Sequence, residues 1–121
     1  MVKILVADDS KFMRMLIIRL LSSCGIKNII EASTGEEVLE KCKQHKQLHL
    51  IFLDINMPGL NGLQTLREIK KVNPSVKVVI VSAIGQEGTV KEALQSGAEE
   101  YITKPFSQEN ILKIVKRFLA Q

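Results

Sequence analysis

Residues 50–59 read LIFLDINMPG. The apolar run at residues 50–53 predicts a β-strand covered on both faces, because short apolar runs bounded by turn residues are typical of such strands. Asp54 follows directly, and a charge at the end of a buried strand is unfavourable unless it is solvated, paired or bound to a metal ion. Asp is also common where a turn begins, so this stretch alone leaves open whether Asp54 only starts the loop.

Length and composition predict one globular domain of ordinary polarity. The chain has 121 residues, of which 45% are hydrophobic and 25% are charged. A chain of this size buries one sizeable core, and its composition is that of an average globular protein. We therefore expect a single domain over residues 1–121, without an output domain.

The net charge is +4, but the basic residues are scattered along the chain and only 4% of residues are aromatic. Nucleic-acid binding favours a clustered basic stripe, with aromatic side chains where single strands are bound, so we expect no nucleic-acid partner. No apolar run approaches the roughly 20 residues needed to cross a bilayer. The apolar segment at the N-terminus is too short for a signal peptide. A cytoplasmic protein without membrane insertion is the resulting expectation.

Short apolar segments alternate with segments of helical periodicity along the whole chain. Strands are expected at 3–7, 28–32, 50–53, 76–81 and 100–103. Helices are expected after Ser10, after Thr34, at 62–72, at 87–96 and after Ser107. This alternation predicts an α/β fold of right-handed βαβ units, with a parallel sheet covered by helices on both faces. The second strand has a weaker apolar pattern than the central ones, which favours a place at or near an edge.

Polar residues are well placed to start the helices. Ser10 is suited to cap the first helix, which is expected to run to about residue 24. Thr34 and Glu37 have the spacing of a capping box for the second helix. The apolar residues of the first helix predict a buried face. That face is expected to contain Phe12, Leu16, Leu20 and Leu21.

Polar residues also follow the strands. In an open parallel sheet the carboxyl ends of all strands lie on one edge, where ligands bind. The first strand ends at Asp8 and Asp9, and the third at Asp54. The fourth strand ends at Ser82 and the fifth at Lys104. Each residue alone has an ordinary explanation, as a helix start, a turn or a surface side chain, but the fold predicts that they gather in one place.

Such a grouping suits phosphoryl transfer. Three crowded carboxylates repel one another, and a hard divalent cation such as Mg²⁺, with Mn²⁺ as a substitute, relieves this repulsion. Nearby Cys and His are lacking, which argues against zinc. Lys104 and the hydroxyl of Ser82 are suited to hold a phosphoryl group. Asp54 would then be the nucleophile that forms an aspartyl-phosphate.

At these residues the chain resembles the response-regulator receiver domains of two-component signalling. The motifs that carry the resemblance are Asp8-Asp9, DINMPGLNG at 54–62, Ser82-Ala83 and Lys104-Pro105-Phe106. DSKFMR at 9–14 and SAIGQ at 82–86 are most similar to the single-domain chemotaxis members. The resemblance implies a flavodoxin-like (βα)5 three-layer sandwich, with five parallel strands in the order 2-1-3-4-5.

The resemblance also implies a role for each site residue. Asp54 would be the phosphoacceptor. Asp9 and Asp54 would bind Mg²⁺ directly, Asp8 through water, and Asn56 through its backbone carbonyl. Lys104 would pair with the acyl phosphate, and the peptide bond between Lys104 and Pro105 would be cis. Ser82 would be the switch hydroxyl, and Tyr101 would turn inward when Ser82 moves toward the phosphoryl group.

The partners implied by the resemblance are a CheA-like histidine kinase and a downstream target such as a flagellar motor switch protein. A phosphatase is a further candidate partner, and a monomer is expected. The chain would catalyse its own phosphorylation and dephosphorylation without being a turnover enzyme. Two alternatives lie within the family, namely a phosphorelay intermediate and a receiver excised from a larger regulator.

Two alternatives come from other classes. A phosphatase of the haloacid-dehalogenase type also uses an Asp nucleophile and Mg²⁺. It needs a second Asp two residues after the nucleophile, where this chain has Asn56, and a cap-domain insertion is lacking. A nucleotide-binding Rossmann-like module needs G-x-G-x-x-G after the first strand, where this chain has Asp8-Asp9-Ser10.

Overall fold

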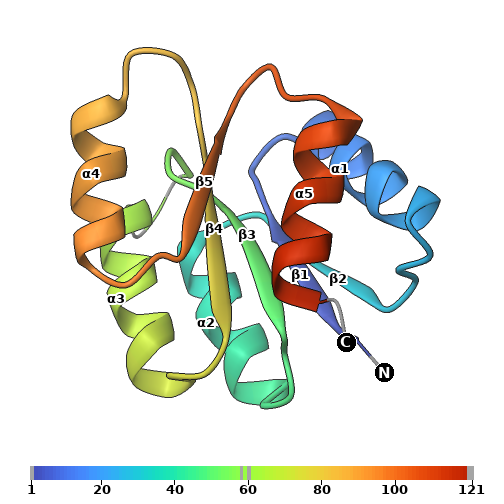
Figure 1. The fold of residues 1–121 in the computed structure, drawn as a ribbon. Coiled ribbons are helices and arrows are strands. Elements are labelled where there is room, and N and C mark those ends of the chain that lie inside the picture. Colours follow the sequence, from blue (N-terminus) through green and yellow to red (C-terminus); the bar gives the residue numbers. More distant parts are fainter. Residues whose placement is uncertain (1, 58, 60, 120–121) are drawn as a thin grey trace.

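The computed structural model describes residues 2–57, 59 and 61–119. Pro58 and Leu60 of the quoted loop lie outside the described residues. The strands are β1 Ile4–Ala7, β2 Ile29–Ala32, β3 Leu50–Asp54, β4 Lys77–Ser82 and β5 Glu100–Thr103. The helices are α1 Lys11–Ser23, α2 Gly35–Gln44, α3 Gly62–Val72, α4 Glu87–Gln95 and α5 Gln108–Leu119. These elements alternate along the chain as the sequence predicts (Figure 1).

The strands form one parallel sheet in the order β2-β1-β3-β4-β5, which confirms the predicted topology. β2 lies at one edge, as its weaker apolar pattern indicates. Every residue of β1 and β3 is buried, because these central strands are covered on both faces. The carboxyl ends of the strands lie together at one edge of the sheet.

Helices cover the two faces of the sheet unequally (Figure 1). α1 and α5 pack on one face, where Ile17 and Ile111 join the apolar cluster of Ile4 and Val6. α2, α3 and α4 pack on the other, where their apolar residues cluster with Leu5 and Ala7. Successive residues of β1 therefore face opposite helical layers, as the twofold alternation of a strand requires. This arrangement is the predicted three-layer sandwich.

Side chains at the helix starts satisfy backbone N–H groups that have no partner within the helix. The Ser10 hydroxyl accepts a hydrogen bond from the Met13 N–H, which confirms this cap. Thr34 likewise accepts from the Glu37 N–H. The Glu37 carboxylate, however, accepts from the N–H of Ser33 instead of Thr34, so the predicted capping box forms only in part.

The buried face of α1 differs from the predicted one. Of the predicted residues, Leu21 is fully buried, Leu16 and Leu20 are partly buried, and Phe12 is 74% exposed. Ile17, which was not predicted, is almost fully buried. The helix is apolar on more than one side, so spacing alone does not decide which stripe faces inward. Packing against β1 and α5 buries the stripe that contains Ile17, and it leaves Phe12 at the start of the helix in contact with solvent.

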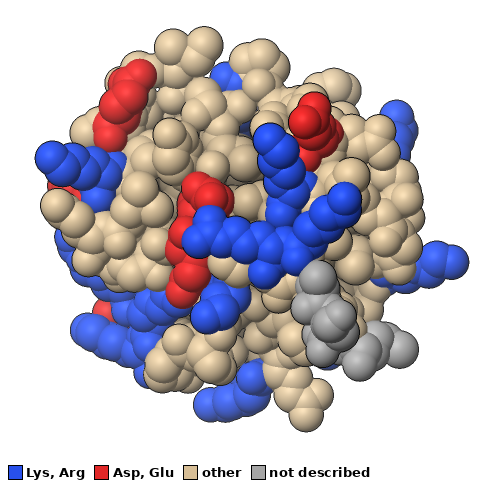
Figure 2. Space-filling view, viewed as in Figure 1, with Lys and Arg blue, Asp and Glu red and all other residues tan. Residues whose placement is uncertain are grey.

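Charge is distributed over the surface. Lys and Arg side chains are spread over the face seen in Figure 2, and Asp and Glu side chains lie among them. Several basic residues lie in the last turns of helices, such as Lys116 and Arg117 of α5, where their charges interact favourably with the negative end of the helix dipole. Among the helices of the described chain, none combines the length and the apolar character that crossing a membrane requires.

Candidate functional site

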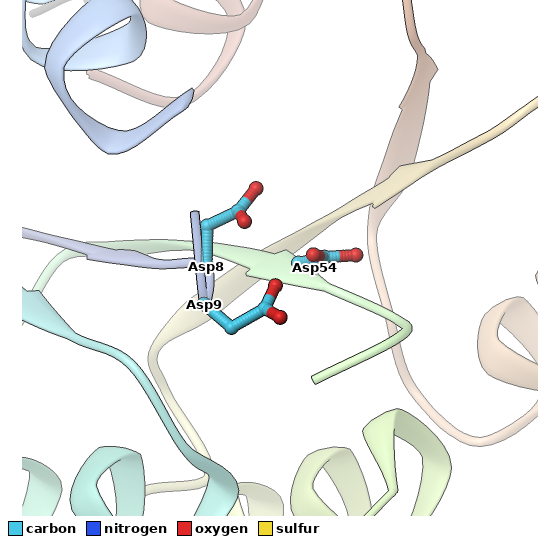
Figure 3. Close-up of side chains that lie close together, drawn as sticks. All are labelled: Asp8, Asp9 and Asp54. Carbon is cyan, nitrogen blue, oxygen red and sulfur yellow. The ribbon is translucent and has the colours of Figure 1, made fainter. Parts of the chain in front are cut away.

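Three carboxylates meet at the carboxyl edge of the sheet. Asp54 is the last residue of β3, and Asp8 and Asp9 follow β1. The strand register pairs Ala7 with Leu53, which brings Asp8 beside Asp54. One carboxylate oxygen of each residue lies within 4.8 Å of the others. Figure 3 shows the three side chains grouped at the ends of two neighbouring strands, as the sequence predicts.

Two of these carboxylates are buried and held by backbone donors. Asp8 and Asp54 are only 1% and 4% exposed, whereas Asp9 lies at the surface. The Ser10 N–H donates to Asp8 Oδ1 at 2.9 Å, and the Asn56 N–H donates to Asp54 Oδ1 at 3.0 Å. These bonds fix the direction of each carboxylate and leave Oδ2 of both available to other groups.

The ammonium group of Lys104 occupies the space between the two buried carboxylates. Its Nζ lies 3.2 Å from Asp8 Oδ2 and 3.5 Å from Asp54 Oδ2. Lys104 directly follows β5, and its N–H donates to the Ser82 carbonyl at the end of β4. The peptide bond between Lys104 and Pro105 is cis, as the resemblance implies. One cation therefore faces two carboxylates, which leaves excess negative charge at the site.

The pKa of Asp8 reflects this crowding. Burial of the carboxyl group raises its pKa above the ordinary value, and the nearby charge of Asp54 raises it further. The hydrogen bond from the Ser10 N–H and the charge of Lys104 act in the opposite direction without cancelling the effect. The ionised form of Asp8 is therefore less favoured here than in the unfolded chain, and added positive charge would favour it.

The donor set suits a hard divalent cation. Among the described residues, the grouping of acidic, His or Cys side chains that fits a metal ion is that of Asp8, Asp9 and Asp54. All the donors are carboxylate oxygens, which Mg²⁺ prefers and which suit zinc poorly. Asn56 is exposed, and its N–H bond brings its backbone beside Asp54. Metal binding by its carbonyl stays a prediction.

Ser82 and Tyr101 line one pocket near the carboxyl ends of β4 and β5. Ser82 is the last residue of β4 and is buried, whereas Tyr101 of β5 is 44% exposed. Both line a pocket of about 260 Å³, whose wall also includes Val90 and Leu94 of α4. The structure therefore places Tyr101 outside the acidic cluster, on the same pocket as Ser82, which the resemblance implies is its partner in a switch.

Sequence reasoning missed two residues that hold this site. Arg14 of α1 donates from Nη1 to the Asp8 carbonyl at 2.8 Å, and from Nε to Glu31 of β2 at 2.8 Å. A signal was present, because a cation near the start of a helix opposes the helix dipole and needs another partner. The sequence does not reveal what that partner is.

The loop after Asp54 leads into α3 through a capping box that was also not predicted. Asn61 accepts from the Gln64 N–H, and the Gln64 side chain accepts from the Asn61 N–H. Gly62 follows at the first helical position, where a Cβ would lie 2.7 Å from the backbone of Ile55. Close packing of this loop therefore fixes the chain just beyond Asp54.

Comparison with known proteins gives a consistent assignment. A family model described as "Response regulator receiver domain" matches residues 4–116. The chemotaxis protein CheY of Bacillus subtilis is 37% identical over 117 residues, which span 97% of both chains. CheY of Thermotoga maritima is 35% identical over 115 residues, or 95% of both chains.

Solved structures agree with these sequence matches. The receiver domain of NtrX from Brucella abortus superposes with a TM-score of 0.90 at 34% identity, and the match covers 97% of this chain and 98% of that one. The same sheet order and an acidic cluster at the expected strand ends accompany these matches. The chain therefore belongs to the response regulator receiver family, whose members are phosphorylation-activated signalling switches.

Proposed function

We propose that this chain accepts a phosphoryl group on Asp54 from the phosphohistidine of a histidine kinase in a Mg²⁺-dependent reaction. The observation that supports this most strongly is the position of Asp54. Its carboxylate is buried, lies beside those of Asp8 and Asp9, and has the Lys104 ammonium 3.5 Å away. A nucleophilic carboxylate, a cluster of acidic residues for a metal ion and a cation are the groups that phosphoryl transfer to Asp54 would use.

In this reaction an Asp54 carboxylate oxygen forms a bond to phosphorus while the bond from phosphorus to the kinase imidazole breaks. The freed nitrogen keeps the electron pair of the broken bond, and the imidazole leaves as the neutral base because its other nitrogen carries a proton. Lys104 stabilises the negative charge on the phosphoryl oxygens. Asp8, Asp9, Asp54 and the Asn56 carbonyl would hold Mg²⁺, which supplies further neutralisation of that charge. Hydrolysis of the acyl phosphate returns Asp54 to its starting state.

Phosphorylation would be read at the pocket that Ser82 and Tyr101 share. A phosphoryl group adds about −1.5 to −2 charge and three acceptor oxygens next to Ser82. We propose that the Ser82 hydroxyl moves to donate to one of these oxygens and that Tyr101 turns into the pocket. The half-exposed side chain of Tyr101 and the 260 Å³ of adjoining space support this step. The surface formed by α4, β5 and α5 would then differ between the two states.

Chemotaxis is the process in which we propose that the switch acts, with a CheA-like kinase and a flagellar motor switch protein as partners. The chemotaxis relatives that match end to end support this proposal. Intact NtrX supports the alternative of a receiver from a larger regulator, because this chain covers only 27% of that protein. A role as a phosphorelay intermediate is the other alternative within the family.

The phosphatase alternative is less well supported. It requires an acid–base carboxylate two residues after the nucleophile, where Asn56 lies exposed and offers only an amide side chain. A switch is consistent with this residue, because an aspartyl-phosphate that is hydrolysed slowly persists long enough to be read.

The proposal is tested by incubating the protein with acetyl phosphate and Mg²⁺ and measuring its intact mass. We expect one added phosphoryl group, and none when EDTA replaces Mg²⁺ or when Asp54→Asn is used. No mass gain in the wild-type protein, or an equal gain in Asp54→Asn, contradicts the assignment. Rapid turnover of a phosphate ester under the same conditions favours the phosphatase.

A further inference from the structure

Arg14 joins three parts of the molecule at the edge of the acidic cluster. It lies on α1, and its side chain is only 15% exposed. One nitrogen, Nη1, donates to the carbonyl oxygen of Asp8 at 2.8 Å. A second, Nε, donates to a carboxylate oxygen of Glu31 on β2, also at 2.8 Å. The guanidinium therefore connects the helix, the turn that carries Asp8 and Asp9, and the edge strand.

The carbonyl that Arg14 binds belongs to the peptide unit between Asp8 and Asp9. A peptide unit is planar, so a bond to its oxygen also fixes the orientation of the Asp9 N–H and restrains the directions in which both side chains leave the backbone. Asp8 is restrained at its other polar groups as well. Its N–H donates to the Ala32 carbonyl, Oδ1 accepts from Ser10, and Oδ2 faces Lys104. Asp9 lies at the surface.

Glu31 gives Arg14 its orientation. Glu31 lies near the carboxyl end of β2, where it pairs in register with Val6 of β1. Its carboxylate accepts a hydrogen bond from Nε, while Nη1 donates to the Asp8 carbonyl. Guanidinium donors have a fixed planar geometry that allows two such bonds at once, whereas a lysine ammonium is a single point of charge on a flexible stem.

We propose that Arg14, oriented by Glu31, is a positioning residue for Mg²⁺ binding, because it fixes the peptide unit between Asp8 and Asp9. The inference rests on the proposed function, since it concerns the ligands of the metal that the phosphoryl reaction uses. Outer partners that orient metal ligands have measurable effects, and their removal commonly weakens metal affinity about 10- to 100-fold. Arg14 acts through backbone geometry and makes no contact with the metal or the phosphoryl group in this account.

Charge and geometry predict opposite effects at this position. Arg14 is a cation near a cation site, so by charge alone its loss would strengthen Mg²⁺ binding, and its replacement by lysine would leave it unchanged. Positioning predicts that Arg14→Lys weakens binding although the charge is kept. Arg19 provides a matched control, because it lies on the same helix with its side chain exposed. Arg19→Ala removes a charge from α1 and leaves the peptide unit between Asp8 and Asp9 untouched.

The experiment is a Mg²⁺ titration followed by amide NMR at constant ionic strength. We expect the dissociation constant to rise about tenfold in Arg14→Lys, on the scale of other outer partners, and to stay within about twofold of wild type in Arg19→Ala, since exposed charges are screened. Glu31→Gln should weaken binding in the wild-type background but have no further effect in Arg14→Lys, because the two residues act as one unit. Thermal unfolding of each variant identifies any loss of the fold.

A second measurement distinguishes a loss of positioning at the metal site from a general loss of reactivity. With acetyl phosphate as donor, Arg14→Lys should need more Mg²⁺ for half-maximal phosphorylation, while its rate at saturating Mg²⁺ approaches that of wild type. Equal or tighter Mg²⁺ binding by a folded Arg14→Lys overturns the inference and leaves the proposed function intact. Failure of the wild-type protein itself to bind Mg²⁺ overturns both.

Discussion

Lys104 Nζ lies 3.5 Å from Asp54 Oδ2, and the same ammonium contacts Asp8. The side chain of Lys104 is 25% exposed, whereas both carboxylates are buried. In the metal-free protein, Lys104 is thus the cation that compensates the two buried charges. At this position the Lys104 ammonium would compete with Mg²⁺ for the two carboxylates, and it would also be close enough to pair with a phosphoryl group on Asp54.

Lys104→Met removes this cation and leaves an unbranched side chain that is one atom shorter. We expect the metal-free variant to lose about 1–2 kcal/mol of stability, because two buried carboxylates lose a counter-charge in a partly solvated site. We also expect Mg²⁺ to stabilise the variant more than wild type, since Lys104 no longer competes. Thermal melts over a range of Mg²⁺ concentrations measure both effects. An equal Mg²⁺-induced rise in melting temperature in the two proteins argues against competition. Arg14→Lys is expected to weaken Mg²⁺ binding, whereas Lys104→Met is expected to strengthen it, so the two variants distinguish the roles of these basic residues.

Asp8→Asn should stabilise the metal-free protein by about 1 kcal/mol at neutral pH, the size of an ordinary single-residue effect. The native state raises the pKa of Asp8 mainly through burial, so it binds a proton there more tightly than the unfolded chain. Between the ordinary and the raised pKa, the stability of wild type therefore increases as pH falls. The advantage of Asp8→Asn should shrink over the same window, because Asp8 itself becomes neutral. Melts at neutral and mildly acidic pH measure this, and an advantage that grows toward acidic pH contradicts it.

Tyr101 is the single tyrosine of a chain that has no tryptophan, so intrinsic fluorescence reports on this residue alone. Beryllium fluoride with Mg²⁺ mimics the phosphoryl group. If Tyr101 then turns into the pocket that Ser82 lines, acrylamide should quench the tyrosine fluorescence at least about twofold less, because the side chain is 44% exposed in the present structure. Asp54→Asn serves as the control and should show no change. Equal quenching of the wild-type protein in the two states would leave Tyr101 without a part in the switch.

Gly62→Ala should disturb both the fold and the site. Its Cβ would lie 2.7 Å from the Cα and the carbonyl oxygen of Ile55, which directly follows Asp54. We expect a loss of about 2 kcal/mol together with slower phosphorylation. Gly88→Ala is the matched control, because a Cβ at that helical position in α4 meets no atom within 4 Å. It should stabilise the protein by about 0.5–1 kcal/mol. Chemical denaturation measures both, and equal effects of the two substitutions contradict this account of the loop.

The architecture could be predicted from the sequence because the apolar runs, the helix starts and the turn residues all indicate the same order of strands and helices. Apolar runs such as residues 50–53 have the length of buried strands, and the residues that follow them suit loops. The gathering of Asp8, Asp54 and Lys104 followed from topology alone, since a parallel sheet brings all carboxyl ends to one edge. The cis bond before Pro105 and the strand order came from the family resemblance, not from the pattern.

Other features could not be predicted because they depend on tertiary packing. The first helix has apolar residues on several sides, and only contact with the sheet and α5 decides that Ile17 is buried and Phe12 exposed. Glu37 and Ser33 pair through the local path of the backbone, which a spacing rule does not describe. Arg14 and Glu31 meet because α1 and β2 both flank β1. Arg14 ends the DSKFMR stretch, but nothing in that stretch indicates Glu31 as its partner.

The most direct test of the central claim is to locate the acyl phosphate itself. The protein is phosphorylated with acetyl phosphate and Mg²⁺, treated with borohydride, which reduces an aspartyl-phosphate to homoserine, and then digested for peptide mass spectrometry. We predict homoserine at position 54 and unmodified Asp8 and Asp9. Homoserine at position 8 or 9, or at no position in a protein whose mass shows phosphorylation, would contradict the assignment of Asp54 as the phosphoacceptor.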